Sequence, residues 1–246
     1  MLAAAALVPE TALLVPGAAG RAEVLPDVRA AALEAISAVV DAGPDRVVVV
    51  VPSTADGDVL RPGPLRPTLS GAGIDDDVLG WPAGWTSGGR GSPDHVVGDV
   101  GASVALFLLG AVGWSGEVEL LAASSCDARR LRALGDRLTD RPQRVALVLP
   151  GSLSARRGPD GPLPDDPRAQ AFDDAVLADL ADFGPAARGR LAAVPAELAQ
   201  ALAVSAWLPW QVLLGASPDG TRGHALWAGA PLGATYAVLS WTVGHR

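Results

Sequence analysis

Two short runs of Val and Leu constrain the fold of this chain more than any other feature. Residues 46–51 have the sequence RVVVVV and residues 144–149 the sequence RVALVL, so polar side chains do not alternate with apolar ones within either run. A strand that is apolar on both faces is typical of a parallel sheet covered by helices on each side. We therefore predict an α/β fold with these two strands near its centre.

The rest of the chain alternates between strand and helix patterns. In residues 22–41, apolar side chains recur every three or four positions and form one stripe along a helix. Further strands are expected at 2–8, 117–123, 224–227 and 234–241. Further helices are expected at 94–113, 127–138 (Asp127 as N-cap), 166–183 (opened by Asp166 and Pro167), 195–203 and 205–214. This order predicts a single domain over 1–246, with a mainly parallel or mixed central sheet flanked by helices on both faces.

Residues 52–93 break the alternation with a stretch rich in Gly, Pro, Asp and Ser. A loop of that length without secondary structure is uncommon, so it either covers a site or contains short strands. It carries Trp81 and Trp85, which could close over an aromatic ligand or could pin the loop to the body of the protein. Pinning is the commoner role.

Charge and cysteine content exclude several classes of function. The net charge is −8 and the arginines are scattered, so we expect neither a nucleic-acid partner nor an anionic membrane surface. Cys126 is the only cysteine, which excludes an intramolecular disulfide and a Cys-based zinc cluster. A reducing, cytoplasmic location fits this best.

The apolar N-terminal residues predict a first strand rather than a signal peptide. They lack a positively charged start, and Pro9 and Pro16 interrupt the apolar segment. The longest apolar stretch, residues 100–114, is shorter than the roughly 20 residues that span a bilayer. We therefore expect a soluble protein.

Standard catalytic motifs are missing from the sequence. No G-x-G-x-x-G follows a strand, and a lysine-free chain has no P-loop. Residues 151–155, GSLSA, lack the second glycine of a nucleophile elbow. The histidines are His95, His224 and His245, and nothing in the sequence places them together, so structural or solvated roles are the default.

The ends of predicted strands supply the candidate site residues. In open α/β sheets, ligands bind outside the carboxyl ends of the strands. Short polar side chains there could hydrogen-bond a small ligand or could satisfy the backbone of their turns. The acids Glu10, Asp56 and Asp58 could also bind a hard cation, although a solvated loop explains them as well. The cleft candidates are Glu10, Thr11, Ser53, Thr54, Ser152 and Ser154.

Several stretches carry a resemblance to a known family. They are LVPETALLVPG (7–17), DRVVVVVPS (45–53), GSLSARR (151–157), DPRAQAFDDAVLADL (166–180), WLPWQVLLGA (207–216) and APLGATYAVLSW (230–241). In these stretches the chain resembles the class III extradiol ring-cleavage dioxygenases of the protocatechuate 4,5-dioxygenase β-subunit type, in a divergent actinobacterial branch. The likeness spans most of the chain, and residues 52–93 are its least similar part.

The resemblance implies an α/β fold with a cleft at the strand ends. In active members, two histidines and a glutamate hold Fe(II) there, open to a catechol and O₂, and another histidine acts as acid and base. This sequence departs from that pattern. Glu10 and Thr11 stand at the first iron histidine, and Ser53 and Thr54 at the second. In the Gly-Asp-x-Ser-His turn of the family, Ala155 replaces the histidine and Ser152 the aspartate, and the ligand glutamate has no clear counterpart.

These departures lead to three hypotheses. The leading one is a non-catalytic protein of this fold, without iron, that binds a small molecule, for instance an aromatic one, or a partner. The alternative is an active Fe(II) dioxygenase with rearranged ligands, such as Glu10 with His95 or His224. The third is an assembly subunit, a homodimer for instance, whose interface would use Trp207, Trp210 and Trp227, although core packing is the commoner fate of tryptophan.

Overall fold

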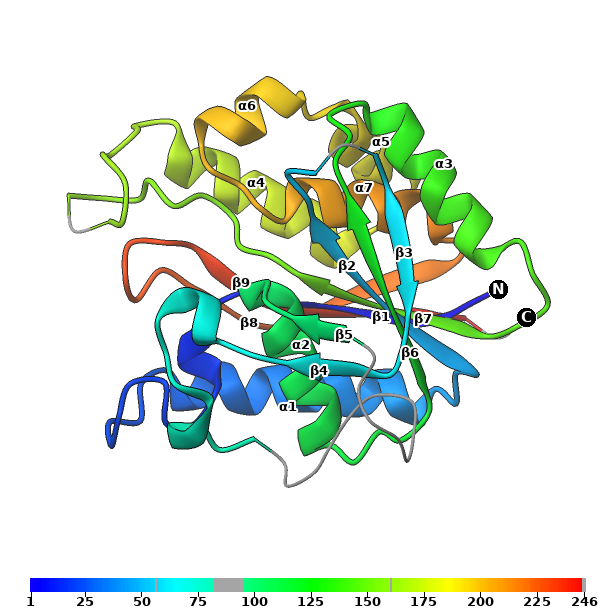
Figure 1. Ribbon diagram of the computed structural model, residues 1–246. Helices are drawn as coiled ribbons and strands as arrows, with labels where there is room; N and C mark the ends of the chain where they lie inside the picture. Colours follow the sequence, from blue (N-terminus) through cyan, green and yellow to red (C-terminus); the bar gives the residue numbers. More distant parts are fainter. Residues whose placement is uncertain (56, 82–94, 160, 245–246) are drawn as a thin grey trace.

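A mixed β-sheet forms the centre of the molecule in the computed structural model, which describes residues 1–55, 57–81, 95–159 and 161–244 (Figure 1). Within these residues the sheet has seven strands in the order β3-β6-β2-β7-β1-β9-β8. The strands are β1 (Leu2–Val8), β2 (Arg46–Pro52), β3 (Val59–Pro62), β6 (Glu117–Ala123), β7 (Val145–Pro150), β8 (Thr221–Gly229) and β9 (Tyr236–Val243). The predicted α/β class with a mixed sheet is confirmed.

The middle of the sheet is parallel and its edges are antiparallel. Strands β6, β2, β7 and β1 run in parallel, while β3 pairs with β6, and β9 with β1 and β8, in antiparallel register. Every residue from Arg46 to Val51 is buried, as the unbroken apolar pattern predicted. The carboxyl ends of β1 and β7 lie side by side, because Val8 is in register with Pro150.

Helices cover both faces of the sheet (Figure 1). One face packs against α1 (Pro26–Asp41) and α2 (Val100–Ala111), and the other against the layer of α3 (Ala128–Thr139) and α7 (Trp207–Ala216). That second layer also contains α4 (Ala169–Asp182), α5 (Pro185–Ala193) and α6 (Ala196–Ala201). Alternate residues of β2 face opposite layers: Val48 and Val50 pack in one apolar cluster, and Val49 packs in the other. This alternation explains why a central strand must be apolar throughout.

Three helices begin later than the sequence patterns indicate. The first is α1, which begins at Pro26 and not at residue 22. Residues His95–Val97 form a short strand, β5, which pairs in parallel with β4 (Leu65–Pro67), and Asp99 then caps α2 by accepting a hydrogen bond from the Ala102 amide, 2.7 Å. Asp166 and Pro167 form a turn before α4 rather than its first residues. Helix α5 was not predicted from the sequence. Among its nine residues only Ala187 and Leu191 are buried, so the segment shows no long apolar stripe.

The long loop contains short strands rather than irregular chain alone. Strands β3 and β4 both lie within residues 52–93, for which short strands were one of the two interpretations that the sequence left open. Trp81 packs edge-on against Phe107 of α2 with ring centroids 6.0 Å apart, so this tryptophan pins the segment to the body of the protein. Trp85 lies outside the described residues. None of the helices in the described part of the chain is long and apolar enough to cross a membrane.

Candidate functional site

A cavity of about 340 Å³ opens at the carboxyl ends of β1 and β7. The loop after β1 contributes Glu10 and Thr11, and the loop after β7 contributes Ser152. Tyr236 closes one side from the start of β9. The remaining wall is made of small side chains, namely Ala12, Ala155, Ala203 and Ala234. The structure thus brings together three of the six candidate residues at the end of the sheet where ligands bind in such folds.

Glu10 is the acidic group of this cavity. Burial raises the pKa of its carboxyl above the ordinary value, a hydrogen bond from Ser205 offsets part of that rise, and the Asp99 carboxylate adds to it. Helix α2 approaches Glu10 closely because it has Gly101 at this point. A Cβ there would lie 3.2 Å from the Glu10 Cβ and 3.1 Å from the Pro150 Cβ. The site therefore holds a desolvated acid beside a second carboxylate.

Ser154 does not line the cavity. It is fully buried, and its amide and hydroxyl both donate to the Asp173 carboxylate of α4, at 3.0 and 2.6 Å. The Thr235 hydroxyl donates to the same carboxylate at 2.6 Å. Asp173 thereby ties the loop after β7 to the turn before β9. Asp173 was not among the residues singled out from the sequence. Its position in the buried stripe of α4, between Ala169 and Val176, could have indicated a buried carboxylate with a structural or functional role.

Ser53 and Thr54 lie at a neighbouring hollow of about 310 Å³ and not at the Glu10 cavity. This hollow is also lined by His95 and Asp99. The Ser53 hydroxyl accepts a hydrogen bond from the Ala55 amide, 3.1 Å, so it satisfies its own turn. Thr54 is exposed. Ser53 therefore serves the turn after β2, which is the second of the two roles that the sequence allowed.

An apolar slot of about 320 Å³ lies on the other side of Ser205. Trp207, Leu208 and Val204 line it, with Cys126 among the other lining residues. The Ser205 hydroxyl accepts from the Ser152 amide at 2.9 Å, so this residue forms part of the wall between the slot and the Glu10 cavity.

The tryptophans proposed as an interface pack inside the protein. Trp207 is 6% exposed and Trp210 is 1% exposed, and the Trp207 indole donates to the Val194 carbonyl at 2.9 Å. Trp227 on β8 is half-buried and packs against the layer of α1 and α2. The interface prediction is therefore wrong for Trp207 and Trp210, whose apolar rings fill the core.

The positions at which the resemblance implies iron ligands do not fit an Fe(II) centre. Glu10 supplies one carboxylate, but Thr11, Ser53 and Thr54 offer only hydroxyl groups, and Ala155 offers no donor. Within the described residues, no group of three His, Cys, Asp or Glu side chains is placed to hold a metal ion. Asp58, the other carboxylate proposed for a cation, is paired with Arg130 at 2.8 Å. Asp56 lies outside the described residues.

The histidines are not gathered at the Glu10 cavity either. His95 is exposed on β5 and lines the Ser53 hollow. His224 is exposed on β8, the edge strand at the opposite end of the sheet from β3. His245 lies outside the described residues. The long loop thus brings His95 toward Asp99, whereas His224 stays at the far edge.

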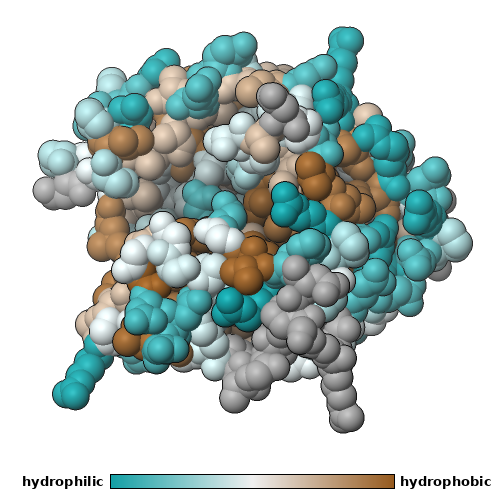
Figure 2. Space-filling view, in the orientation of Figure 1, coloured by the Kyte–Doolittle hydropathy of each residue, from teal (hydrophilic) through white to brown (hydrophobic). Residues whose placement is uncertain are grey.

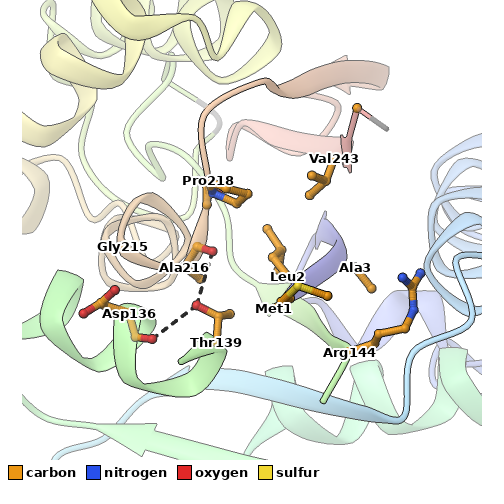
Figure 3. Close-up of a pocket in the computed structure, with 12 residues that line it drawn as sticks. Met1, Leu2, Ala3, Asp136, Thr139, Arg144, Gly215, Ala216, Pro218 and Val243 are labelled. Carbon is orange, nitrogen blue, oxygen red and sulfur yellow. Dashed lines mark hydrogen bonds between the residues drawn. The ribbon is translucent and has the colours of Figure 1, made fainter. Parts of the chain in front are cut away.

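A larger hollow, about 470 Å³, lies at the opposite end of the strands (Figure 3). It is lined by Leu2 at the start of β1 and by the C-terminal turns of α3 and α7. The Thr139 hydroxyl lies 3.2 Å from the Asp136 carbonyl and 3.5 Å from the Ala216 carbonyl (Figure 3). The Arg144 guanidinium is already bonded to the Gly43 carbonyl. Despite its size, this hollow is at the wrong end of the sheet for the site and contains none of the candidate residues.

Comparison with known proteins supports the fold alone. No family model matches the chain, and no curated protein matches it. Among solved structures, the crystal structure of the uncharacterized protein JW3007 from Escherichia coli K12 is similar, with a TM-score of 0.56 and 15% sequence identity. The match covers 98% of this chain and 99% of that chain. The two proteins share the fold over almost their whole length.

Proposed function

We propose that this protein is a non-catalytic, small-molecule-binding member of the extradiol-dioxygenase-like fold, with the Glu10 cavity as its binding site. The observation that carries the proposal is the replacement of an iron-binding donor set by one desolvated acid and hydroxyl groups, at the end of the sheet where ligands bind. The resemblance in the first loop and in the loop after β7 supports the scaffold assignment.

The size and lining of the cavity support a small aromatic ligand. An apolar cavity of about 150 Å³ is enough to hold benzene, and the Glu10 cavity measures about 340 Å³. Its four alanines offer apolar contacts, and Glu10, Thr11 and Ser152 offer hydrogen-bonding groups. Polar groups that converge on a pocket fix the orientation of its ligand.

Anaerobic reconstitution with Fe(II), followed by metal analysis and O₂ uptake with catechol, tests the non-catalytic part of the proposal. We expect iron well below one equivalent and no O₂ uptake above the protein-free control. Near-stoichiometric iron with uptake would instead establish the alternative, an enzyme with rearranged ligands. Glu10, Asp99 and His95 are then the residues to substitute, because Asp99 acts on Glu10 and lines the hollow of His95.

Catechol also tests the binding part, as a probe observed by proton NMR. We expect its signals to broaden with the wild-type protein and to stay sharp with Ala155→Leu or Ala12→Leu, because each added side chain fills the cavity. Ala30→Leu, at an exposed position of α1, is the matched control and should behave as wild type. Broadening that is absent with wild type, or unchanged in both cavity variants, would refute binding at this site.

A further inference from the structure

We propose that the Glu10 cavity selects a small organic ammonium ion, with the charged nitrogen at Glu10 and an apolar body against the alanine wall. This inference rests on the proposed function and names the class of ligand for the same site. It follows from the charge of Glu10 in the lining, from two hydroxyl groups without partners within the described residues, and from the alanines of the lining.

The electrostatics of the cavity favour a cation. Glu10 is the charged residue among the described residues that line it, and the charged neighbour that acts on Glu10 is another acid, Asp99. No arginine or histidine lines the cavity in the described part of the chain. An anionic ligand would meet the Glu10 carboxylate without a compensating positive charge in the lining, whereas an ammonium ion would pair with that carboxylate.

The positive end of helix α2 does not change this balance. Helix N-termini attract anions because their first amides lack partners. Here the Asp99 carboxylate already occupies that end and accepts from the Ala102 amide at 2.7 Å. The dipole of α2 is therefore satisfied by the protein itself and leaves no anion site beside Glu10.

Two residues of the cavity lining have hydroxyl groups without a hydrogen-bond partner in the described part of the chain. Ser152 is 7% exposed and Tyr236 is 9% exposed, and both line the cavity. Their hydroxyl groups form no hydrogen bond within the described residues. These two hydroxyl groups are therefore available to a ligand that enters the cavity. An ammonium group has three N–H donors, which matches these two oxygens together with the Glu10 carboxylate.

The alanines of the lining favour a ligand with a small apolar body. The cavity is lined by Ala12, Ala155, Ala203 and Ala234 as well as by the polar residues. A simple alkali cation would leave that surface without contact, whereas an organic ammonium covers it. Apolar burial then adds about 25 cal/mol per Å² of surface removed from water.

Three ligands of matched size test this selection at pH 8: benzylamine, benzyl alcohol and benzoate. They share one ring and differ in the charge of the head group. By isothermal titration calorimetry or ligand-observed NMR, we expect benzylamine to bind at least tenfold more tightly than benzoate and more tightly than benzyl alcohol. In Glu10→Gln the preference over benzoate should disappear, while the matched exposed variant Glu34→Gln should keep it.

Ser152→Ala provides a second variant that does not alter the charge. It should weaken benzylamine several-fold and leave benzyl alcohol less affected, because an oxygen that accepts from the ammonium group is lost. Equal binding of benzylamine and benzyl alcohol, or tighter binding of benzoate, would overturn the selection for a cation and leave the proposed function standing. If none of the three ligands binds and catechol does not bind either, both proposals fail.

Discussion

At the scale of single residues, Ala203 occupies a backbone conformation that favours glycine. Its φ is 55°, and it follows α6 at the turn between the Glu10 cavity and the apolar slot. The Ala203 amide donates to the Gln200 carbonyl at 3.0 Å, and the Val204 amide donates to the Ala199 carbonyl at 2.8 Å. This pair of bonds defines a Schellman turn, whose left-handed position is usually Gly. The alanine methyl group is strained there and lines the cavity.

Ala203→Gly should therefore stabilise the protein by about 1 kcal/mol, because a left-handed alanine costs about that much relative to glycine. Chemical denaturation measures the change as a higher midpoint with an unchanged slope. Ala30→Gly in the exposed face of α1 is the control and should destabilise by a similar amount. A lower midpoint for Ala203→Gly would show that the methyl group contributes more by packing than it costs in strain.

The raised pKa of Glu10 makes stability depend on pH in a defined direction. Below the ordinary value of 4.5 the carboxyl is protonated in both the folded and the unfolded chain, so its ionisation changes nothing. As the pH rises, the unfolded chain loses this proton first, so the free energy of unfolding falls until the pH exceeds the raised folded pKa.

Glu10→Gln removes the fall in the free energy of unfolding that ionisation of Glu10 causes. We expect the variant to be more stable than wild type at pH 8 and equal to it near pH 4, with the difference developing above pH 4.5. Melting temperatures from calorimetry across this range measure it. The control Glu34→Gln, at an exposed site, should give a difference that does not grow with pH. A variant less stable than wild type at pH 8 would mean that the Glu10 carboxylate is compensated in the fold.

At the scale of elements, the crossing of α3 and α7 depends on two glycines. A Cβ on Gly135 would lie 1.9 Å from the Val212 carbonyl oxygen, and a Cβ on Gly215 would lie 1.9 Å from the Arg132 carbonyl oxygen. Both obstacles are backbone atoms, so neither can move aside as a flexible side chain would. The helix backbones therefore approach closely only because both positions lack a side chain. Figure 1 shows α3 and α7 side by side above the sheet.

Gly135→Ala should destabilise the protein by about 3 kcal/mol, at the upper end of the cost of overpacking. Gly189→Ala in α5 is the matched control, because a Cβ there meets nothing within 4 Å and the position is exposed. It should stabilise by up to about 1 kcal/mol through helix propensity. Denaturant midpoints of the two variants should move in opposite directions, and movement in the same direction would contradict the close crossing.

Strands β3 and β5 are more exposed to solvent than the central strands of the sheet. Apolar side chains reach the surface over β3 and β5 (Figure 2), where Leu60 is 43% exposed and Val96 is 55% exposed. Strand β3 is an edge strand whose four residues are all exposed. The element therefore contributes little to the core, in contrast with the fully buried β7.

At the scale of the whole molecule, two apolar layers share the same central strands. Leu147 of β7 packs in the layer of α3 to α7, and Val148 beside it packs in the layer of α1 and α2. Neither layer can lose its structure without exposing the strands that support the other. We therefore expect unfolding in one cooperative transition.

Substitutions in either layer should shift that one transition. Leu147→Ala should lower stability by about 3 kcal/mol, and Ile36→Val in the other layer by about 1 kcal/mol. Far-UV circular dichroism and tryptophan fluorescence should give superimposable denaturation curves for wild type and both variants. A curve that splits into two steps in either variant would show that the layers unfold independently.

The sequence by itself determined the central sheet. Residues 46–51 and 117–123 became β2 and β6 as their patterns indicated, because strands buried on both faces of a sheet are mainly apolar. The two buried charges of these strands, Arg46 and Glu119, pair with each other. Likewise, Asp127 caps α3 through its own side chain, which accepts from the Arg129 amide at 2.8 Å. These are local properties, and a local pattern is sufficient to predict them.

Only the tertiary structure decided what the candidate residues do. Ser152 and Ser154 are two positions apart in one turn, yet Ser152 lines the cavity while Ser154 is bonded to Asp173. Neighbours that are distant in sequence made that distinction, as they did for Glu10, whose environment is set by Asp99 and Ser205. The electrostatic field at a site, the burial of its side chains and the bonding of its hydroxyl groups depend on such long-range contacts, so a local sequence pattern does not predict them.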